Sequence, residues 1–144
     1  MTRYWIAVAS REHVKKGITE GIAQVCHGKQ GPLKRMNPGN WIIYYSPTEI
    51  FGEKQPCRKF TAIGCIKDKE PYQFKINDTF IPWRRDVSFL PAREVAIESL
   101  VEKLSFIKNK KNWGFIFRYG LLTIPKQDFL LIAKEMGIAS EKIS

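Results

Sequence analysis

Three short apolar runs limit most strongly what this chain of 144 residues can fold into. They cover residues 3–9, 41–46 and 60–67, and they are rich in aromatic and β-branched side chains. Apolar residues at successive positions, ended by polar or turn-forming residues, are typical of strands that are buried on both faces. We therefore expect these runs to form the main strands of a sheet, with the first of them in a central position.

Further segments predict weaker strands. Residues 72–76 alternate polar and apolar side chains, as a half-exposed strand does. Residues 81–90 continue this character, and Pro82 predicts that the strand begins at an edge or a bend. By residue type, residues 113–120 match a last short strand.

Helices are expected at three places. Ser10 is a typical N-cap for a short helix that would end at Gly17. The apolar spacing around residues 97–104 supports one or two helical turns, and residues 125–137 form the clearest amphipathic helix. Strands with few intervening helices favour an α+β fold with a mostly antiparallel barrel or curled sheet of about five or six strands.

Size and charge narrow the class of protein. A chain of 144 residues is expected to form one domain, covering residues 1–144. The 24 Lys and Arg residues exceed the 14 Asp and Glu residues, and the net charge of +10 is typical of a nucleic-acid-binding domain.

The cysteine content argues against a metal or disulfide framework. Three cysteines without a CxxC pair, with only two histidines, suggest neither zinc nor disulfides. We expect no metal, no cofactor and a reducing, cytoplasmic environment. The apolar run near the N-terminus is flanked by basic residues and is too short for a signal peptide or a membrane span, so no membrane contact is expected.

Residues 21–33 combine several glycines with a varied set of polar side chains, those of Gln24, Cys26, His27 and Lys29. The segment has no period of 2 or 3.6, which favours a loop. Loops on a rigid scaffold often carry binding residues. Two interpretations stay open from these residues alone: a pocket wall, or a surface loop with a solvated lysine and a partly buried cysteine.

The sequence lacks the motifs of common enzyme classes. It has no serine nucleophile elbow, HExxH motif, P-loop or dinucleotide-binding fingerprint. Cys26 and His27 are a candidate catalytic pair, but adjacent residues seldom reach each other in a usable geometry, and no acidic residue lies nearby to orient them. We expect a protein that is not an enzyme.

Aromatic residues lie next to basic ones in residues 83–85, 106–113 and 117–119. Rings stack on unpaired bases while cations contact the phosphate backbone, so this combination indicates binding of single-stranded nucleic acid or flipped bases. The alternative for each segment is a core aromatic residue beside a solvated basic one. For Trp83 and Trp113 the two interpretations are evenly balanced.

Several segments, in their order and spacing, resemble a bacterial EVE-domain protein over almost the whole chain. They are YWIAVAS (4–10), GIAQVCHGK (21–29), PGN (38–40) leading into IIYYS (42–46), FTAIG (60–64), WRR (83–85) and SFIKNKKNWG (105–114). The resemblance implies a PUA-like fold: a twisted, partly closed β-barrel with short peripheral helices and a C-terminal helix. It also implies kinship with YTH domains, which read a methylated adenine.

The same resemblance implies a pocket beside the first strand that holds a modified base between aromatic walls. Carried over by position, its ligand-binding residues are Ala9, Ser10, Gln24, Cys26, His27, Lys29, Tyr44, Tyr45, Ser46, Trp83 and Trp113. Readers of methylated bases commonly have a Trp in the loop that corresponds to residues 22–25, where this chain has Ala23 and Gln24. A different base or different walls are therefore expected.

The leading hypothesis is a non-enzymatic module that binds a modified or flipped nucleobase of RNA or DNA. Gln24 and Ser10 would contact the base edge, and Tyr45 or Trp83 would stack on the base. The expected phosphate contacts are Lys29, Arg84, Arg85 and Arg118. The alternatives are a small-molecule or nucleotide sensor that takes no polymer, and an enzyme that acts through Cys26 and His27. The sequence leaves the base, the polymer and the oligomeric state open.

Overall fold

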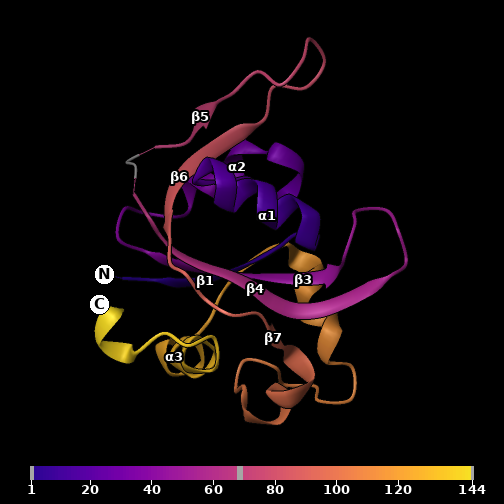
Figure 1. Cartoon of the computed structure of the whole chain (residues 1–144), viewed down its shortest axis with the longest axis vertical. Helices are drawn as coiled ribbons and strands as arrows, with labels where there is room; N and C mark the ends of the chain where they lie inside the picture. Colours follow the sequence, from indigo (N-terminus) through magenta and orange to yellow (C-terminus); the bar gives the residue numbers. More distant parts are fainter. Residues whose placement is uncertain (1, 68–69, 144) are drawn as a thin grey trace.

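A computed structural model describes residues 2–67 and 70–143. A curled mixed sheet forms a half-barrel, and short helices pack against it (Figure 1). The strands are β1 (Tyr4–Val8), β2 (Ile22–Ala23), β3 (Trp41–Thr48), β4 (Pro56–Ile66), β5 (Tyr72–Gln73), β6 (Trp83–Phe89), β7 (Val95–Ala96) and β8 (Leu121–Thr123). The α-helices are α1 (Arg11–Glu20), α2 (Gln30–Lys34) and α3 (Lys126–Glu135), with 3₁₀ turns at Cys26–Gly28, Ile97–Ser99, Val101–Lys103, Trp113–Tyr119 and Ser140–Lys142.

The sheet has the strand order β2-β6-β4-β3-β1-β8. Its strands pair mostly antiparallel, as predicted, but β1 and β3 run parallel with Ile6 opposite Ile43. Parallel neighbours need a long crossover, and residues 9–40, which contain α1 and α2, provide it. β1 also pairs with β8 on its other side, which confirms the expected central position.

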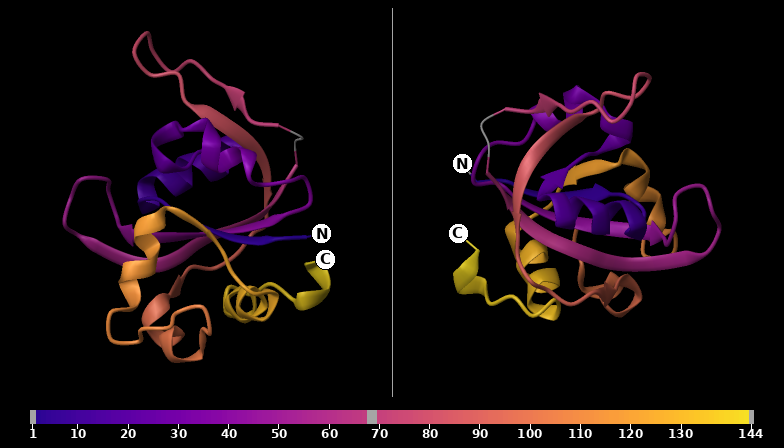
Figure 2. Two further views of the ribbon diagram at one scale, coloured as in Figure 1. Left: turned by 180° about the vertical axis from the view of Figure 1, so that it is seen from behind. Right: turned by 45° about the horizontal axis from the view of Figure 1, so that its top comes forward.

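Within residues 2–67 and 70–143 the sheet contains eight strands, more than the five or six expected. The difference comes from strands such as β2, β5 and β7, each of two residues, which are too short to show a periodic pattern. The long strands produce the curl. β4 spans 11 residues and curves along its length (Figure 2). Its register with β3 shifts between Tyr44 and Tyr45 and again between Ser46 and Thr48. Such irregularities bend a strand and increase its twist.

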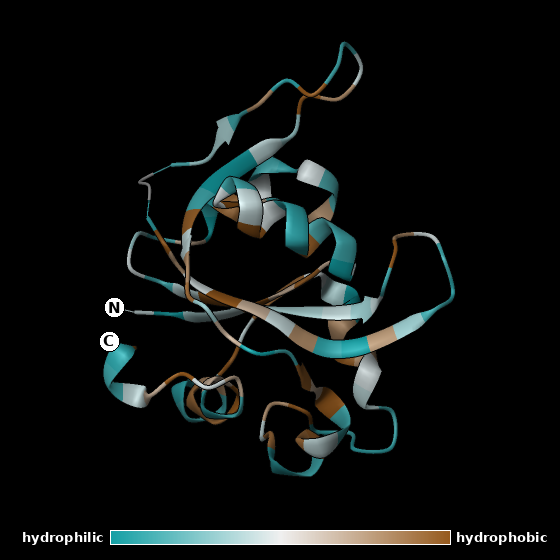
Figure 3. Ribbon diagram, viewed as in Figure 1, coloured by the Kyte–Doolittle hydropathy of each residue, from teal (hydrophilic) through white to brown (hydrophobic). Residues whose placement is uncertain are grey.

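The sheet separates two hydrophobic cores. Side chains alternate along β1, so Tyr4 and Ile6 join one core while Trp5 and Ala7 join the other. α3 covers the first core with Phe129 and other apolar residues, and its remaining surface is hydrophilic (Figure 3). α1 and α2 lie across the other face of the sheet (Figure 1).

α1 begins as predicted but ends later. The Ser10 side chain accepts a hydrogen bond from the backbone N–H of His13, which confirms Ser10 as the N-cap. The helix runs past Gly17 to a left-handed cap at Gly21. A Cβ at Gly17 would lie 2.9 Å from the carbonyl oxygen of Ile22. Gly17 therefore allows the next strand to pack closely and does not end the helix.

Two other predicted elements differ in kind. Residues 113–120 are not a strand: Trp113–Tyr119 is a 3₁₀ helix, and the edge strand β8 starts only after Gly120. Aromatic and β-branched residues favour strands because they fit a half-buried surface. In this segment such residues pack into the core from a 3₁₀ helix instead: Phe117 stacks on Tyr45 with ring centroids 4.2 Å apart. The helical turns expected around residues 97–104 are two separate 3₁₀ turns.

The segment between β5 and β6 projects from the body of the fold (Figure 1). The strand expected over residues 72–76 is regular only at Tyr72–Gln73. Beyond it, the backbone N–H of Phe74 donates to the carbonyl of Pro82 and that of Ile76 to the carbonyl of Phe80, at 3.0 and 3.1 Å. Residues 74–82 thus form an irregular hairpin.

Within residues 2–67 and 70–143, every helix is too short or too polar to cross a membrane.

Candidate functional site

A cavity of about 750 Å³ opens beside the end of β1. Its walls come from Val8–Ser10, from α1, from the loop after β2, from the β3–β4 loop, from the hairpin of residues 74–82 and from residues 117–120. The volume lies in the range that small-molecule and cofactor sites occupy. Segments far apart in the sequence therefore meet around one space.

The glycine-rich stretch forms one wall, but it is not a loop throughout. Residues 30–34 form the short helix α2, which the sequence pattern did not indicate. Cys26 and His27 have φ angles of 48° and 61°, in the left-handed region that non-glycine residues rarely adopt. Such strain persists only where the surrounding structure holds it, and it occurs often in binding loops.

Glycines at two positions allow neighbouring backbones to approach this loop. A Cβ at Gly28 would lie 2.5 Å from the Cβ of Pro82, so Gly28 brings the hairpin of residues 74–82 against the loop. A Cβ at Gly120 would lie 2.9 Å from the sulfur of Cys26. The loop is thus enclosed from both sides.

A hydrogen bond fixes the orientation of the Gln24 side chain in the cavity wall. Arg84 Nε donates a hydrogen bond to Gln24 Oε1 at 2.5 Å. A guanidinium can only donate, so the amide oxygen must face Arg84 and the amide NH₂ is the group that Gln24 can offer a ligand. Arg84 is itself held by Glu20 at 3.7 Å and by the ring of Phe74, whose centroid lies 4.2 Å from the guanidinium carbon.

Tyr44 anchors the same loop through a hydrogen bond to its backbone. Its hydroxyl donates to the backbone carbonyl of Gln24 at 3.2 Å, and its side chain is buried while lining the cavity. Burial raises the pKa of Tyr44 well above its ordinary value, so the hydroxyl remains a donor at neutral pH.

Aromatic rings cover the opening of the cavity. Phe51, from the β3–β4 loop, lies 5.9 Å from the ring of His13 and 5.5 Å from the ring of His27. Phe80, from the hairpin of residues 74–82, and Tyr119 add two more exposed rings. Phe51, Phe80, Tyr119 and His13 were absent from the predicted site. For Phe51 the sequence offered a signal: a large aromatic residue in a mostly polar excursion between strands.

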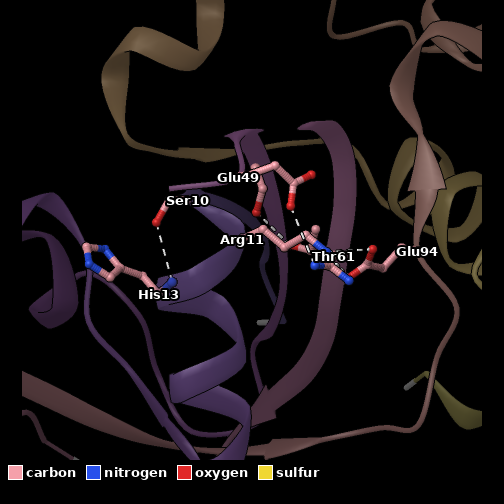
Figure 4. Close-up of polar contacts among 7 residues, drawn as sticks. Ser10, Arg11, His13, Glu49, Thr61 and Glu94 are labelled. Atoms are coloured by element: carbon pink, nitrogen blue, oxygen red, sulfur yellow. Dashed lines mark hydrogen bonds and ion pairs between the residues drawn. The ribbon is translucent and has the colours of Figure 1, made fainter. Parts of the chain in front are cut away.

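An ion-pair cluster fixes the loop that carries Phe51. Arg11 Nε donates to both carboxylate oxygens of Glu94 at 3.0 and 2.9 Å, and Arg11 Nη1 lies 3.5 Å from Glu49 (Figure 4). The backbone N–H of Glu12 also donates to the carbonyl of Glu49. In Figure 4, His13 points away from this cluster, so one end of α1 both anchors the loop and presents a ring to the cavity.

The structure brings part of the predicted site together. The predicted residues that line the cavity are Ala9, Ser10, Gln24, Cys26, His27, Tyr44, Arg84 and Arg118. Cys26 and His27 contact different neighbours: the sulfur of Cys26 lies against Gly120, and the ring of His27 lies against Phe51.

The other predicted ligand-binding residues lie outside the cavity lining. Tyr45 points to the opposite face of the sheet and stacks on Phe117. Ser46 is fully buried, 2.8 Å from the hydroxyl of Thr61. Trp113 packs edge-on against Tyr45, and Trp83 packs, partly buried, against the core that contains Trp5 and Ala7.

Two of the predicted phosphate contacts also lie outside the cavity lining. Arg85 is fully buried, and its Nη1 donates to the carbonyls of Leu33 (3.0 Å) and Met36. A side chain with no exposed surface holds α2 in place and does not reach a phosphate. Lys29 is exposed but lies outside the cavity lining. Throughout residues 2–67 and 70–143, no three His, Cys, Asp or Glu side chains gather in a way that could hold a metal ion.

Comparison with known proteins identifies relatives over most of the chain. The family model of the EVE domain matches residues 3–135. A UPF0310 protein of Bacillus licheniformis is 50% identical over 127 residues, covering 88% of this chain and 86% of the relative. The UPF0310 protein YdcG of Bacillus subtilis is 43% identical, covering 95% and 94%.

Solved structures share the fold at low sequence identity. Protein Atu2648 of Agrobacterium tumefaciens superposes with a TM-score of 0.60 at 12% identity, covering 96% of this chain and 95% of that one. Rpa0253 of Rhodopseudomonas palustris gives a TM-score of 0.58 at 12% identity, covering 94% of each chain.

Proposed function

The chain belongs to the EVE-domain family, and on that basis we propose that it is a non-enzymatic module that takes a modified or flipped nucleobase of RNA or DNA into the cavity beside β1. The fold is consistent with a binding module. The observation that carries the proposal is the Gln24 amide, which Arg84 orients toward a space rimmed by aromatic rings.

The chemistry of the cavity suits a nucleobase. Flat rings such as those of Phe51 and Phe80 stack on bases, each of which has a π-face. The Gln24 NH₂ group donates to acceptors, which every base presents on its edges. The buried Tyr44 keeps this loop in place, so the donor is positioned before a ligand arrives.

Charge at the rim suits the polymer. Lys16 and Arg118 line the cavity, both are exposed, and the whole chain carries a net charge of +10. Contacts between such residues and phosphates release counterions, so binding of the polymer weakens as salt rises. Contacts to the base itself depend much less on salt.

The test is a titration with single-stranded nonamers of DNA and RNA. Each carries at its centre cytosine, adenine, or a methylated or hydroxymethylated form of these bases. We expect one modified base to be bound at least about tenfold more tightly than its parent, at both about 50 mM and about 200 mM salt. Equal, weak binding to all nonamers that disappears at the higher salt would overturn the proposal.

Two variants connect the result to the cavity. Gln24→Ala should remove the preference for the modified base, while Gln55→Ala, an exposed glutamine outside the cavity lining, should keep it. If free nucleosides raise the melting temperature but nonamers do not, the ligand is a small molecule and the polymer part of the proposal fails.

A further inference from the structure

We propose that a second groove, adjoining the cavity, holds the neighbouring base of the same strand, stacked on Phe74. This inference rests on the proposed function and names how the polymer continues past the cavity. The groove lies between α1 and the hairpin of residues 74–82 and measures about 610 Å³. None of its residues was predicted to touch a base.

The groove and the cavity are continuous. Lys16, Glu20, Ile76 and Arg84 line both. A strand that places one base in the cavity therefore passes directly into the groove, without crossing another part of the surface.

Phe74 provides a stacking surface that is already built. Its ring is 47 % exposed, and the guanidinium of Arg84 covers one face at 4.2 Å. Arg84 is in turn held by Gln24 and Glu20, so the ring rests on a fixed support. The other face of an exposed ring can accept any base, because stacking does not depend on sequence.

The groove carries an excess of positive charge, which favours binding of a polyanion. Lys15 and Lys16 project from α1 along one wall, and both are exposed. Glu20 is the acidic residue of the lining and it already pairs with Arg84. An exposed ring between lysines and an arginine fits a nucleotide, with the base on Phe74 and its phosphate toward Lys15 and Lys16.

The test compares Phe74→Ala with a matched control. Phe115 is also an exposed ring contacted by an arginine, Arg118 at 4.8 Å, but it lines neither the groove nor the cavity. The probes are the nonamer that the wild-type protein binds most tightly in the panel above and the nucleoside monophosphate of its central base.

Phe74→Ala should weaken nonamer binding by about five- to 150-fold, the loss expected for one base stack. Binding of the monophosphate should stay unchanged, because it occupies only the cavity. Phe74→Tyr and Phe115→Ala should bind the nonamer like the wild type. Should Phe74→Ala fail to fold, Phe74→Leu keeps apolar packing over Arg84 without a ring, and the same loss is expected.

Removing the neighbouring base from the probe gives an independent readout. An abasic site on one side of the central base should weaken wild-type binding as much as Phe74→Ala does and should have no further effect on that variant. Two results would overturn the proposal of a second groove while leaving the base preference of the cavity intact. One is that Phe74→Ala binds the nonamer as tightly as the wild type does. The other is that the losses from Phe74→Ala and from the abasic site multiply when the two are combined. A wild type without any base preference would instead overturn the proposed function, and this inference with it.

Discussion

Arg84 and Gln24 lie 60 residues apart in the sequence, and the hydrogen bond between them determines which end of the Gln24 amide faces the cavity. The guanidinium offers only donors, so it holds the amide oxygen and leaves the amide nitrogen for a ligand. The wall therefore presents a hydrogen-bond donor at this point.

Replacing Gln24 by Glu tests this donor directly. In Gln24→Glu the carboxylate can still accept the hydrogen bond from Arg84, but it has no hydrogen-bond donor for a ligand. We expect binding of the preferred nonamer to fall by about five- to 150-fold, since a lost hydrogen bond in a desolvated site costs about 1–3 kcal/mol. Titration of the variant measures the effect, and its melting temperature serves as the control for folding. Undiminished affinity would show that the Gln24 NH₂ group does not contact the ligand.

The ring of Phe51 should contribute to binding and not to folding. Its side chain is 61 % exposed and lies over His13 and His27 at the opening of the cavity. We expect Phe51→Ala to weaken binding of the nonamer by about five- to 150-fold, as loss of a base stack does, and to change the free energy of unfolding by less than about 0.5 kcal/mol. Ile50→Ala, at the preceding position, should leave affinity unchanged. An Ile50→Ala loss of equal size would mean that the whole loop, and not the ring, is responsible.

Arg85 should matter for stability. Its fully buried side chain donates to the carbonyls of Leu33 and Met36. Arg85→Ala leaves a void and unpaired carbonyls, for which we expect a loss of about 2–5 kcal/mol in the free energy of unfolding. Arg35→Ala, at an exposed position next to α2, should cost less than about 0.5 kcal/mol. Urea unfolding followed by circular dichroism measures both, and a similar small cost for the two variants would contradict the structural role of Arg85.

Stability should fall at alkaline pH, in part through Tyr44. Burial raises its pKa in the folded state above the ordinary value of 10.0, so above that pH the unfolded chain loses this proton while the folded chain keeps it. The unfolded state then binds fewer protons, and the free energy of unfolding decreases as pH rises. Burial also raises the pKa of Tyr45 to about 12 and that of Cys57 to about 11, which adds to the same trend.

The measurement is the urea midpoint at about pH 8 and about pH 10.5. Tyr44→Phe, which has no proton to lose, should show a smaller decrease between the two than the wild type. Tyr119→Phe removes an exposed hydroxyl and should match the wild type. Equal decreases in wild type and Tyr44→Phe would rule out Tyr44 as a source of the alkaline loss.

Local patterns in the sequence were sufficient for much of the fold. The apolar runs at residues 3–9, 41–46 and 60–67 correspond to β1, β3 and β4, and the amphipathic pattern at residues 125–137 corresponds to α3. Ser10 caps α1 through a contact only three residues away. These features depend on neighbours in the chain, so composition and spacing determine them.

The candidate site depended on contacts that no local pattern describes. Tyr44 and Tyr45 are adjacent and chemically alike, yet the sheet turns one toward the cavity and the other into the opposite core. Arg84 and Arg85 likewise separate into a cavity wall and a buried support.

The sequence by itself thus determined the family, the main strands and the cap of α1, and it predicted a site near Gln24. Only the tertiary structure decided which aromatic and basic residues reach the cavity. The physical reason is that a side chain's surroundings depend on strand pairing and on long loops, which brought Phe51, Phe80 and Arg84 from distant parts of the chain to the cavity that Gln24 lines.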